Sequence, residues 1–295
     1  MKTNRTVLLS LVTVCSALGF SLDCLAQATL TPRGQAIYAR LRNLVPAETP
    51  PALLNLPTQP AVGIDGQTPE HLLRALGYDA IPLMEVQDRA TIYDDGARRL
   101  RIPRGVNASF KFADRKLIAL SAKPASSQVS VDVAARKVGE KLQSLGIPAT
   151  EVWRINPLPL RLDVANADTD ESVLDATVGH VVNIKRHVGG FPVLGSECQF
   201  VLEQRGETSW LRCRWPTFAR NTTAVRSLDL ALRGMSAQID ASLHPAQLTE
   251  LATISADFVY AERVRNAVAD YVPSLRVVLG YEDEAREELL EPLSL

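Results

Sequence analysis

The sequence predicts an α+β fold in which helices pack on one side of an antiparallel β-sheet. Two patterns predict it. Ala134, Val138 and Leu142 recur every four residues in the clearest amphipathic helix of the chain, and Gly146 ends that helix. Three later segments are read as successive strands, and the last two alternate apolar and polar side chains, which is typical of strands with one exposed face. These segments are residues 180–187, 197–204 and 208–215.

The start of the chain has the pattern of an export signal. Lys2 and Arg5 precede an apolar stretch from Val7 to Leu22, and Ala26-Gln27-Ala28 is a small-x-small cleavage pattern. We therefore expect export to the periplasm or the extracellular space, with a mature chain that begins at Thr29.

Two alternatives to plain export are weaker. A membrane anchor is disfavoured because the apolar stretch is short and Asp23 interrupts it. A lipid attached to Cys24 is disfavoured because a lipidation site needs a small residue where Asp23 stands. No later segment is long and apolar enough to span a bilayer.

The charge balance argues against nucleic acid as a partner. The chain has 32 basic and 33 acidic residues, and removal of the first 28 residues leaves 30 and 32. A nearly neutral chain has no broad positive field for a polyanion.

The patterns divide the chain into five segments. They are a signal peptide, 1–28; an N-terminal helix and Pro-rich linker, 29–62; an α+β unit with β-hairpins, 63–125; a central unit, 126–219; and C-terminal helices with closing strands, 220–295.

Further elements are expected around the central strands. The expected helices are 29–45, 68–76, 225–239, 245–254 and a tail at 281–290. The expected strands are 81–85, 90–93, 98–102, 151–156, 258–260, 275–279 and a hairpin at 107–120 that turns at 113–116. Residues 157–178 are expected to form an exposed polar insertion.

The two cysteines of the mature chain are expected to form a disulfide. A hairpin centred between Arg205 and Gly206 places Cys198 directly opposite Cys213. A two-residue loop would make them a hydrogen-bonded pair, whereas a four-residue loop gives the closer pair that suits disulfide geometry. We favour the four-residue loop, and the alternative is two buried free thiols.

Residues 188–195 contain the most distinctive motif. The chain is expected to reverse through Gly189-Gly190 and to turn again at Gly195, joining two strands of the sheet. Gly190, Pro192, Val193 and Gly195 resemble the glycine-x-proline-valine-x-glycine crossing of PepSY-type modules, which are propeptide-like domains found in front of thermolysin-type metalloproteases.

The resemblance covers Ser130 to Trp215 and implies a fold and a role. It implies PepSY/cystatin-like units, each with one helix lying across an antiparallel sheet. Residues 110–120, and residues 258–260 together with 273–275, resemble the end strands of such modules more weakly, which implies that the unit could repeat. The implied role is contact with another protein, such as a secreted protease. Because no protease domain follows in this chain, we expect that contact to occur in trans.

Catalytic and metal motifs are missing from the sequence. It lacks His-Glu-x-x-His, Gly-x-Ser-x-Gly, a phosphate loop and paired-cysteine metal motifs, so we expect no enzyme and no cofactor. His180 and His187 are seven residues apart on one expected strand and should face opposite ways. We expect these two, His71 and His244 to be ordinary surface or half-buried histidines.

Two charged groups have alternative interpretations. Asp94-Asp95, and Asp168 with Asp170-Glu171, could bind a cation, but solvated loops are the favoured interpretation. The basic group is Arg98, Arg99, Arg101 and Arg104. Within it, Arg99 and Arg101 should share a strand face and could grip an acidic partner, although a charged edge strand is favoured.

The three tryptophans are expected to lie in the core. In the predicted register Trp215 shares the face of Cys213 and Trp210 lies on the other face, so Trp153, Trp210 and Trp215 should not form one sugar-stacking platform.

The sequence favours a secreted, non-enzymatic, protein-binding module. By resemblance it would inhibit a protease or assist folding in trans. The alternative is an envelope or surface module that binds a small molecule or carbohydrate, which exposed aromatic residues on a concave sheet would favour.

Overall fold

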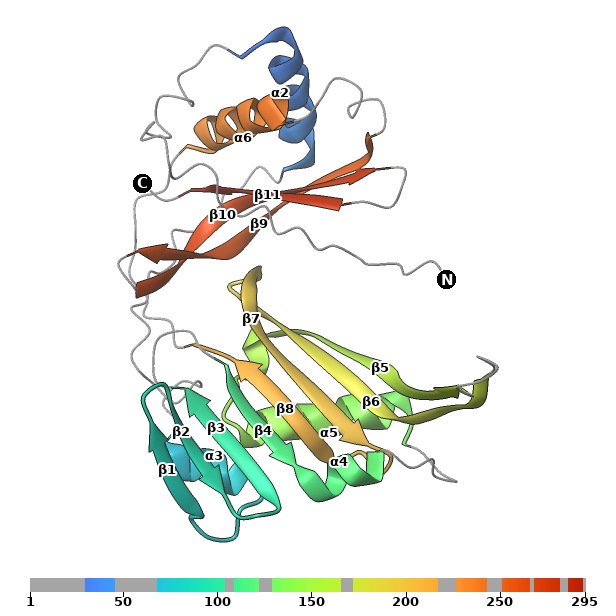
Figure 1. Ribbon diagram of the computed structural model, residues 1–295. Coiled ribbons are helices and arrows are strands. Elements are labelled where there is room, and N and C mark those ends of the chain that lie inside the picture. Colours follow the sequence, from blue (N-terminus) through green and yellow to red (C-terminus); the bar gives the residue numbers. More distant parts are fainter. Residues whose placement is uncertain are drawn as a thin grey trace.

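Strands dominate the structure, a computed structural model that describes residues 30–45, 68–103, 109–121, 129–165, 172–216, 227–242, 251–265, 268–281 and 286–293. Within these ranges, 11 strands form one sheet (Figure 1). All neighbouring strands are antiparallel except β7 and β9, whose contact is parallel, so the sheet is mixed.

The bounds of the elements are as follows. The helices are α2 (Pro32–Leu44), α3 (Pro69–Ala75), α4 (Arg115–Ser121), α5 (Val131–Ser144), the short 3₁₀ helix η1 (Ala149–Glu151) and α6 (Leu228–Ser242). The strands are β1 (Leu83–Gln87), β2 (Ala90–Asp94), β3 (Arg98–Pro103), β4 (Phe110–Asp114), β5 (Val152–Ala165), β6 (Ser172–Val188), β7 (Phe191–Glu203), β8 (Thr208–Arg214), β9 (Leu251–Arg265), β10 (Val268–Tyr281) and β11 (Arg286–Pro292).

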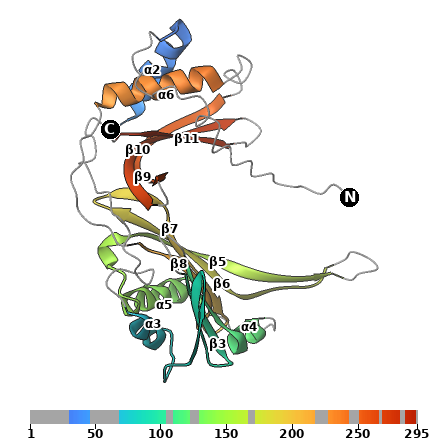
Figure 2. The same cartoon turned by 60° about the vertical axis from the view of Figure 1, so that its left-hand side comes forward.

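The sheet has two parts that meet at β7. The larger part, in the order β1-β2-β3-β4-β8-β7-β6-β5, is called the large sheet below. The smaller part is β9-β10-β11, in which Phe258 lies opposite Leu275. One parallel pairing, between Val193 of β7 and Tyr260 of β9, connects the two parts. Figure 2 shows them stacked one above the other with β7 rising between them.

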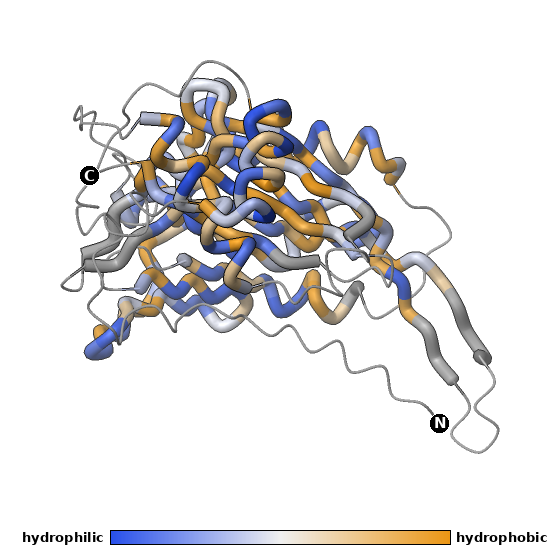
Figure 3. The backbone as a smooth tube through the Cα atoms, turned by 90° about the horizontal axis from the view of Figure 1, so that it is seen from above, coloured by the Kyte–Doolittle hydropathy of each residue, from blue (hydrophilic) through white to orange (hydrophobic). Residues whose placement is uncertain are grey.

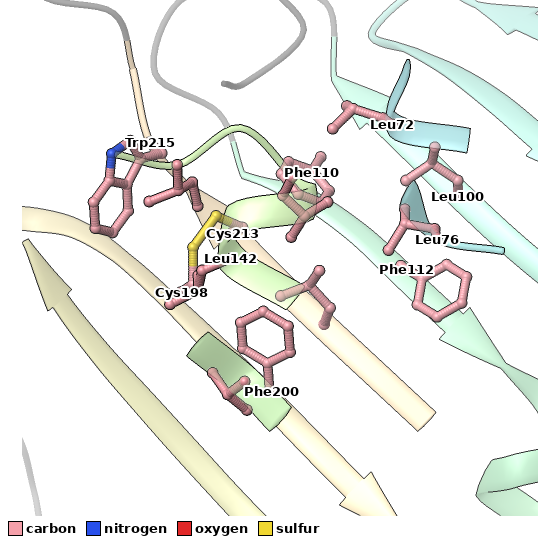
Figure 4. Close-up of a cluster of buried hydrophobic side chains, with 14 of the residues drawn as sticks. Leu72, Leu76, Leu100, Phe110, Phe112, Leu142, Cys198, Phe200, Cys213 and Trp215 are labelled. Carbon is pink, nitrogen blue, oxygen red and sulfur yellow. A yellow bond between two sulfur atoms is a disulfide. The ribbon is translucent and has the colours of Figure 1, made fainter. Parts of the chain in front are cut away.

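One face of the large sheet carries the main core. Ala134, Val138 and Leu142 of α5 pack there against strand residues such as Phe112 and Phe200 (Figure 4). Helix α5 begins at Ser130, whose hydroxyl accepts a hydrogen bond from the Val133 N–H, as an N-cap does. The opposite face of the large sheet, called the open face below, holds the alternate, mostly polar residues of the same strands.

The smaller sheet has its own core. Helices α2 and α6 lie together on it and bury Leu41, Leu232 and Met235 against β10 residues Leu275 and Val277. Figures 1 and 2 show both helices on the side of the smaller sheet that faces away from the large one. Hydrophobic and hydrophilic residues alternate along much of the chain in Figure 3, as expected where one side of each element meets a core.

The predicted fold class is wrong. The prediction was an α+β arrangement of helices on an antiparallel sheet in PepSY/cystatin-like units, whereas most of the described chain is a single large mixed sheet with few helices. Segments expected to be helical or irregular are strands. Residues 157–165 and 172–178 belong to β5 and β6, residues 251–254 to β9, and residues 286–290 of the expected helical tail to β11.

One segment that was expected to be a strand is a helix. Residues 117–120 were expected to return as a strand, but they belong to helix α4. The carboxylate of Asp114 accepts hydrogen bonds from the N–H groups of Lys116 and Leu117, both 3.0 Å long. Asp114 therefore caps a helix rather than opening a β-turn.

Candidate protein-docking site

The glycine-rich motif lies where β7 passes from the large sheet to the smaller sheet. Gly189 and Gly190 have φ of 58° and 90° and form the expected tight reversal between β6 and β7. Gly195 does not make a second turn, because it lies inside the continuous strand β7 with φ of 71°. There the register against β6 jumps: Lys185 lies opposite Glu197, but His187 lies opposite Pro192. The prediction of a two-turn crossing is therefore wrong in its second half.

Residues 193–196 of β7 have no register partner in β6, and contacts at this point connect the two parts of the sheet. Val193 pairs with Tyr260 and forms a small buried cluster with Tyr260 and Tyr271. Arg214 of β8 reaches Glu262 of β9, with 2.6 Å between Nη2 and Oε1. Burial raises the pKa of Tyr271 to about 12, so this phenol stays neutral at physiological pH. Val193 thus has a structural role at the joint.

The cysteine hairpin is confirmed. The Sγ atoms of Cys198 and Cys213 are 1.97 Å apart and their Cα atoms 4.0 Å apart. The two residues lie directly opposite each other, and the four residues 204–207 connect β7 to β8, as predicted. The symmetric register slips by one residue beyond Val201, because Leu202 pairs with Thr208 and Ser209 is left over.

Within the described part of the chain, the histidines and Asp94-Asp95 form no metal site. The described residues contain no group of three or more His, Cys, Asp or Glu side chains that could hold a metal. Asp94 accepts two hydrogen bonds from the Arg115 guanidinium, 2.8 and 3.0 Å long, which lower the pKa of that carboxyl. Asp95 accepts from backbone N–H groups of its own turn. The predicted candidates at 168, 170 and 171, and His244, lie outside the described residues.

His180 differs from the prediction because it is buried, with 4% exposure, on the core face of β6 beside Leu202. Burial lowers its pKa below the ordinary value, since desolvation penalises the imidazolium. The unfolded chain therefore binds a proton more readily than the folded one, and stability should fall as pH drops below about 6.5. Urea titrations of wild type and His180→Leu should show a smaller acid loss between pH 7 and 5 in the variant. An identical loss in both would contradict this assignment.

The tryptophans occupy separate places. Trp215 is 1% exposed and lies in the core with Cys213, whereas Trp210 is half-buried on the open face. Trp153 was expected in the core but is 51% exposed on β5. The described tryptophans therefore form no single stacking platform, as predicted, and the proposed small-molecule surface gains no support.

The most distinctive surface is the edge strand β1. All five of its residues are exposed, and Leu83, Met84 and Val86 are 87%, 58% and 52% exposed. Ile81, just before it, is 67% exposed. The strand also contains Glu85 and Gln87, so its edge is partly rather than wholly apolar. An exposed edge strand with apolar side chains is a template for the addition of another strand, and soluble proteins usually block such edges.

Two other edges, β5 and β11, are protected. Strand β5 contains Pro157 and Pro159, which have no N–H to offer an added strand. Strand β11 carries three glutamates and ends at Pro292. Strand β1 therefore lacks the prolines that protect β5 and the several glutamates that protect β11.

The backbone of β1 presents a defined pattern of donors and acceptors. Gln87 pairs with Ala90 across a two-residue turn, so this closing pair is hydrogen-bonded to β2 and the pairs then alternate. Met84 and Val86 fall on the alternate pairs, so their N–H and C=O groups point away from β2. These are the groups that an added strand would bind.

The basic group of the sequence lies on β3, which is not an edge strand because β2 and β4 flank it. The favoured interpretation, a charged edge that resists aggregation, is therefore wrong. Arg98 is drawn toward the core side, 3.4 Å from the Asp114 carboxylate. Arg99 and Arg101 share the open face, as predicted, since Leu100 between them lies in the core. Arg104 lies outside the described residues.

Comparison with known proteins adds no identity. No protein-family model matches the chain, and no curated protein is significantly similar to it. Among the described residues, no helix is both long and apolar enough to cross a membrane.

Proposed function

We propose that this chain is an exported, non-enzymatic module that binds an extended segment of another protein by strand addition at β1. The observation that carries the proposal is that β1 is fully exposed and has three apolar residues beside Glu85 and Gln87, whereas β5 carries two prolines and β11 carries three glutamates and a proline. Main-chain hydrogen bonds to Met84 and Val86 would supply affinity, and the side chains that alternate along β1 would supply specificity.

The fold does not support a PepSY-type module, so the class of partner is proposed only from the short motif at Gly190, Pro192, Val193 and Gly195. A secreted protease, inhibited or assisted in folding by this chain in trans, would present extended segments of the kind that an open edge accepts. The export pattern of the first 28 residues is consistent with such a partner.

Val86→Pro is the sharpest test. Proline removes the N–H that faces an incoming strand and leaves the β1–β2 hydrogen bonds in place, so binding should weaken at least roughly tenfold with little loss of stability. The matched control is Val86→Thr, which keeps the shape and the N–H. Peptides selected from a displayed library against the mature chain would be titrated against wild type and both variants by fluorescence anisotropy.

Two results would sink the proposal. One is a set of selected peptides that bind Val86→Pro as well as wild type. The other is hydrogen exchange in which the Met84 and Val86 amides gain no protection when peptide binds, because strand addition must protect them. Inhibition assays with secreted proteases would then test the partner class separately.

A further inference from the structure

Three cations lie directly beside one another across the open face. Arg101 of β3 is the register partner of Lys111 of β4, and Lys111 is the partner of Arg212 of β8. Their chain neighbours Leu100, Phe112 and Leu211 are all in the core, so the three charged residues point to the other side. Lys111 and Arg212 are exposed and Arg101 is half-buried. These three residues are called the cationic row.

The cationic row is an unfavourable arrangement for stability. Like charges directly opposite each other on paired strands repel. In the described part of the chain, neither Arg101 nor Lys111 has an acidic oxygen within the 4.0 Å of an ion pair, and the Nε of Arg212 donates to the hydroxyl of Ser109 at 3.3 Å. Lys185, on the same face, is by contrast paired with Glu197. Among the described residues, the open face therefore pairs several of its cations, such as Lys185 and Arg214, but leaves these three adjacent ones without a carboxylate.

Further polar groups beside the cationic row could also bind an anion. Arg99, two residues from Arg101 on the same face, lies 4.0 Å from Asp94. On the other side the next register partners of Arg212 are Gln199 and then Asn183, joined by a 2.9 Å hydrogen bond from amide to amide. Five adjacent strands thus present guanidinium, ammonium and amide groups in one line.

We propose that the cationic row binds an acidic segment of another polypeptide. Guanidinium groups bind carboxylates through paired hydrogen bonds, and adjacent strands are about 4.8 Å apart, so Arg101 and Arg212 are roughly 10 Å apart. Three or four extended residues span that distance, which matches a short run of Asp and Glu. The net charge of −1 leaves no broad field or long track for nucleic acid. The proposal stands independently of strand addition at β1.

The test uses the full mature chain and a labelled octaglutamate peptide, with octaglutamine as the neutral control. Each of Arg101→Gln, Lys111→Gln and Arg212→Gln should weaken octaglutamate binding by roughly three- to tenfold, and added salt should weaken binding to wild type more than to the variants. Lys185→Gln and Arg136→Gln are matched controls, because each removes one positive charge that is already paired.

Stability provides a second readout that a structural role would not give. Neutralising Lys111, which lies between the two arginines, removes repulsion on both sides, so Lys111→Gln should unfold at a temperature equal to or higher than wild type while it loses binding. A lower unfolding temperature would assign the row a structural role. Equal binding of octaglutamine, or tighter binding of oligothymidylate or oligogalacturonate, would overturn an acidic polypeptide as the ligand.

Discussion

Reduction of the Cys198–Cys213 disulfide is expected to lower the free energy of unfolding by about 3 kcal/mol. The bond joins residues 15 apart, and closure of a loop of this length restricts the unfolded chain by about that amount in the chain-entropy model. Both cysteines are at most 1% exposed in the main core, so the loss should appear in global unfolding of the large sheet. For a chain of this size the melting temperature should fall by roughly 6–12 °C.

The measurement is urea unfolding of wild type with and without tris(2-carboxyethyl)phosphine. The control is the double variant Cys198→Ala/Cys213→Ala, whose unfolding midpoint should not respond to the reductant. If reduced and oxidised wild type unfold at the same urea concentration, the disulfide does not stabilise the fold.

This hairpin could be predicted because all the information lies within one short segment. Alternation on both sides of Gln204–Glu207 fixes the register, and the register fixes the cysteine pair. Helix α5 was predictable for the same reason, since its cap at Ser130 and its apolar stripe are local. Predictions of this kind need no knowledge of the rest of the chain.

The errors follow from non-local pairing and from two local signals that were misread. The polar and acidic character of residues 157–178 suggested an exposed insertion, but proline is tolerated on an edge strand and Leu158, Leu160 and Leu162 still alternate. Ile254, Ala256 and Phe258 alternate in the same way within β9. These two patterns could have revealed the strands.

The candidate site could not be predicted because an edge exists only in the finished topology. The sequence predicts a strand near residues 81–85 but does not tell whether anything pairs with its outer side. Likewise Arg101, Lys111 and Arg212 become neighbours only because β4 pairs with β3 on one side and, on the other, with β8, where Arg212 lies about a hundred residues after Lys111 in the chain. The spacing of residues along one strand cannot predict a row of charges that is formed by three different strands.

Arg186→Met is expected to cost about 3 kcal/mol of stability. The Arg186 side chain is 2% exposed, its Nη2 lies 2.7 Å from Glu151 Oε2, and its Nη1 donates to the carbonyl of Pro216 at 2.7 Å. The guanidinium also lies 5.0 Å from the Trp215 ring. Removal of one member of a buried pair leaves the other charge poorly compensated, which typically costs 3–5 kcal/mol. We expect the lower end, because Glu151 keeps 27% exposure and its hydrogen bond from Trp215.

A double-mutant cycle separates this pair from simple loss of packing. Glu151→Gln retains an acceptor for Trp215, so Glu151→Gln/Arg186→Met should lose clearly less than the sum of the two single variants. The same cycle on Arg136 and Glu140, a pair with 62% and 61% exposure, should give only about 0.3–0.5 kcal/mol of coupling. Strict additivity at Arg186 and Glu151 would show that they do not act as a pair. Arg186 of β6 also donates to Ser196 of β7, and Pro216 lies just after the end of β8. Coupling would therefore show that this pair helps to hold these three strands together where β7 leaves the large sheet for the smaller one.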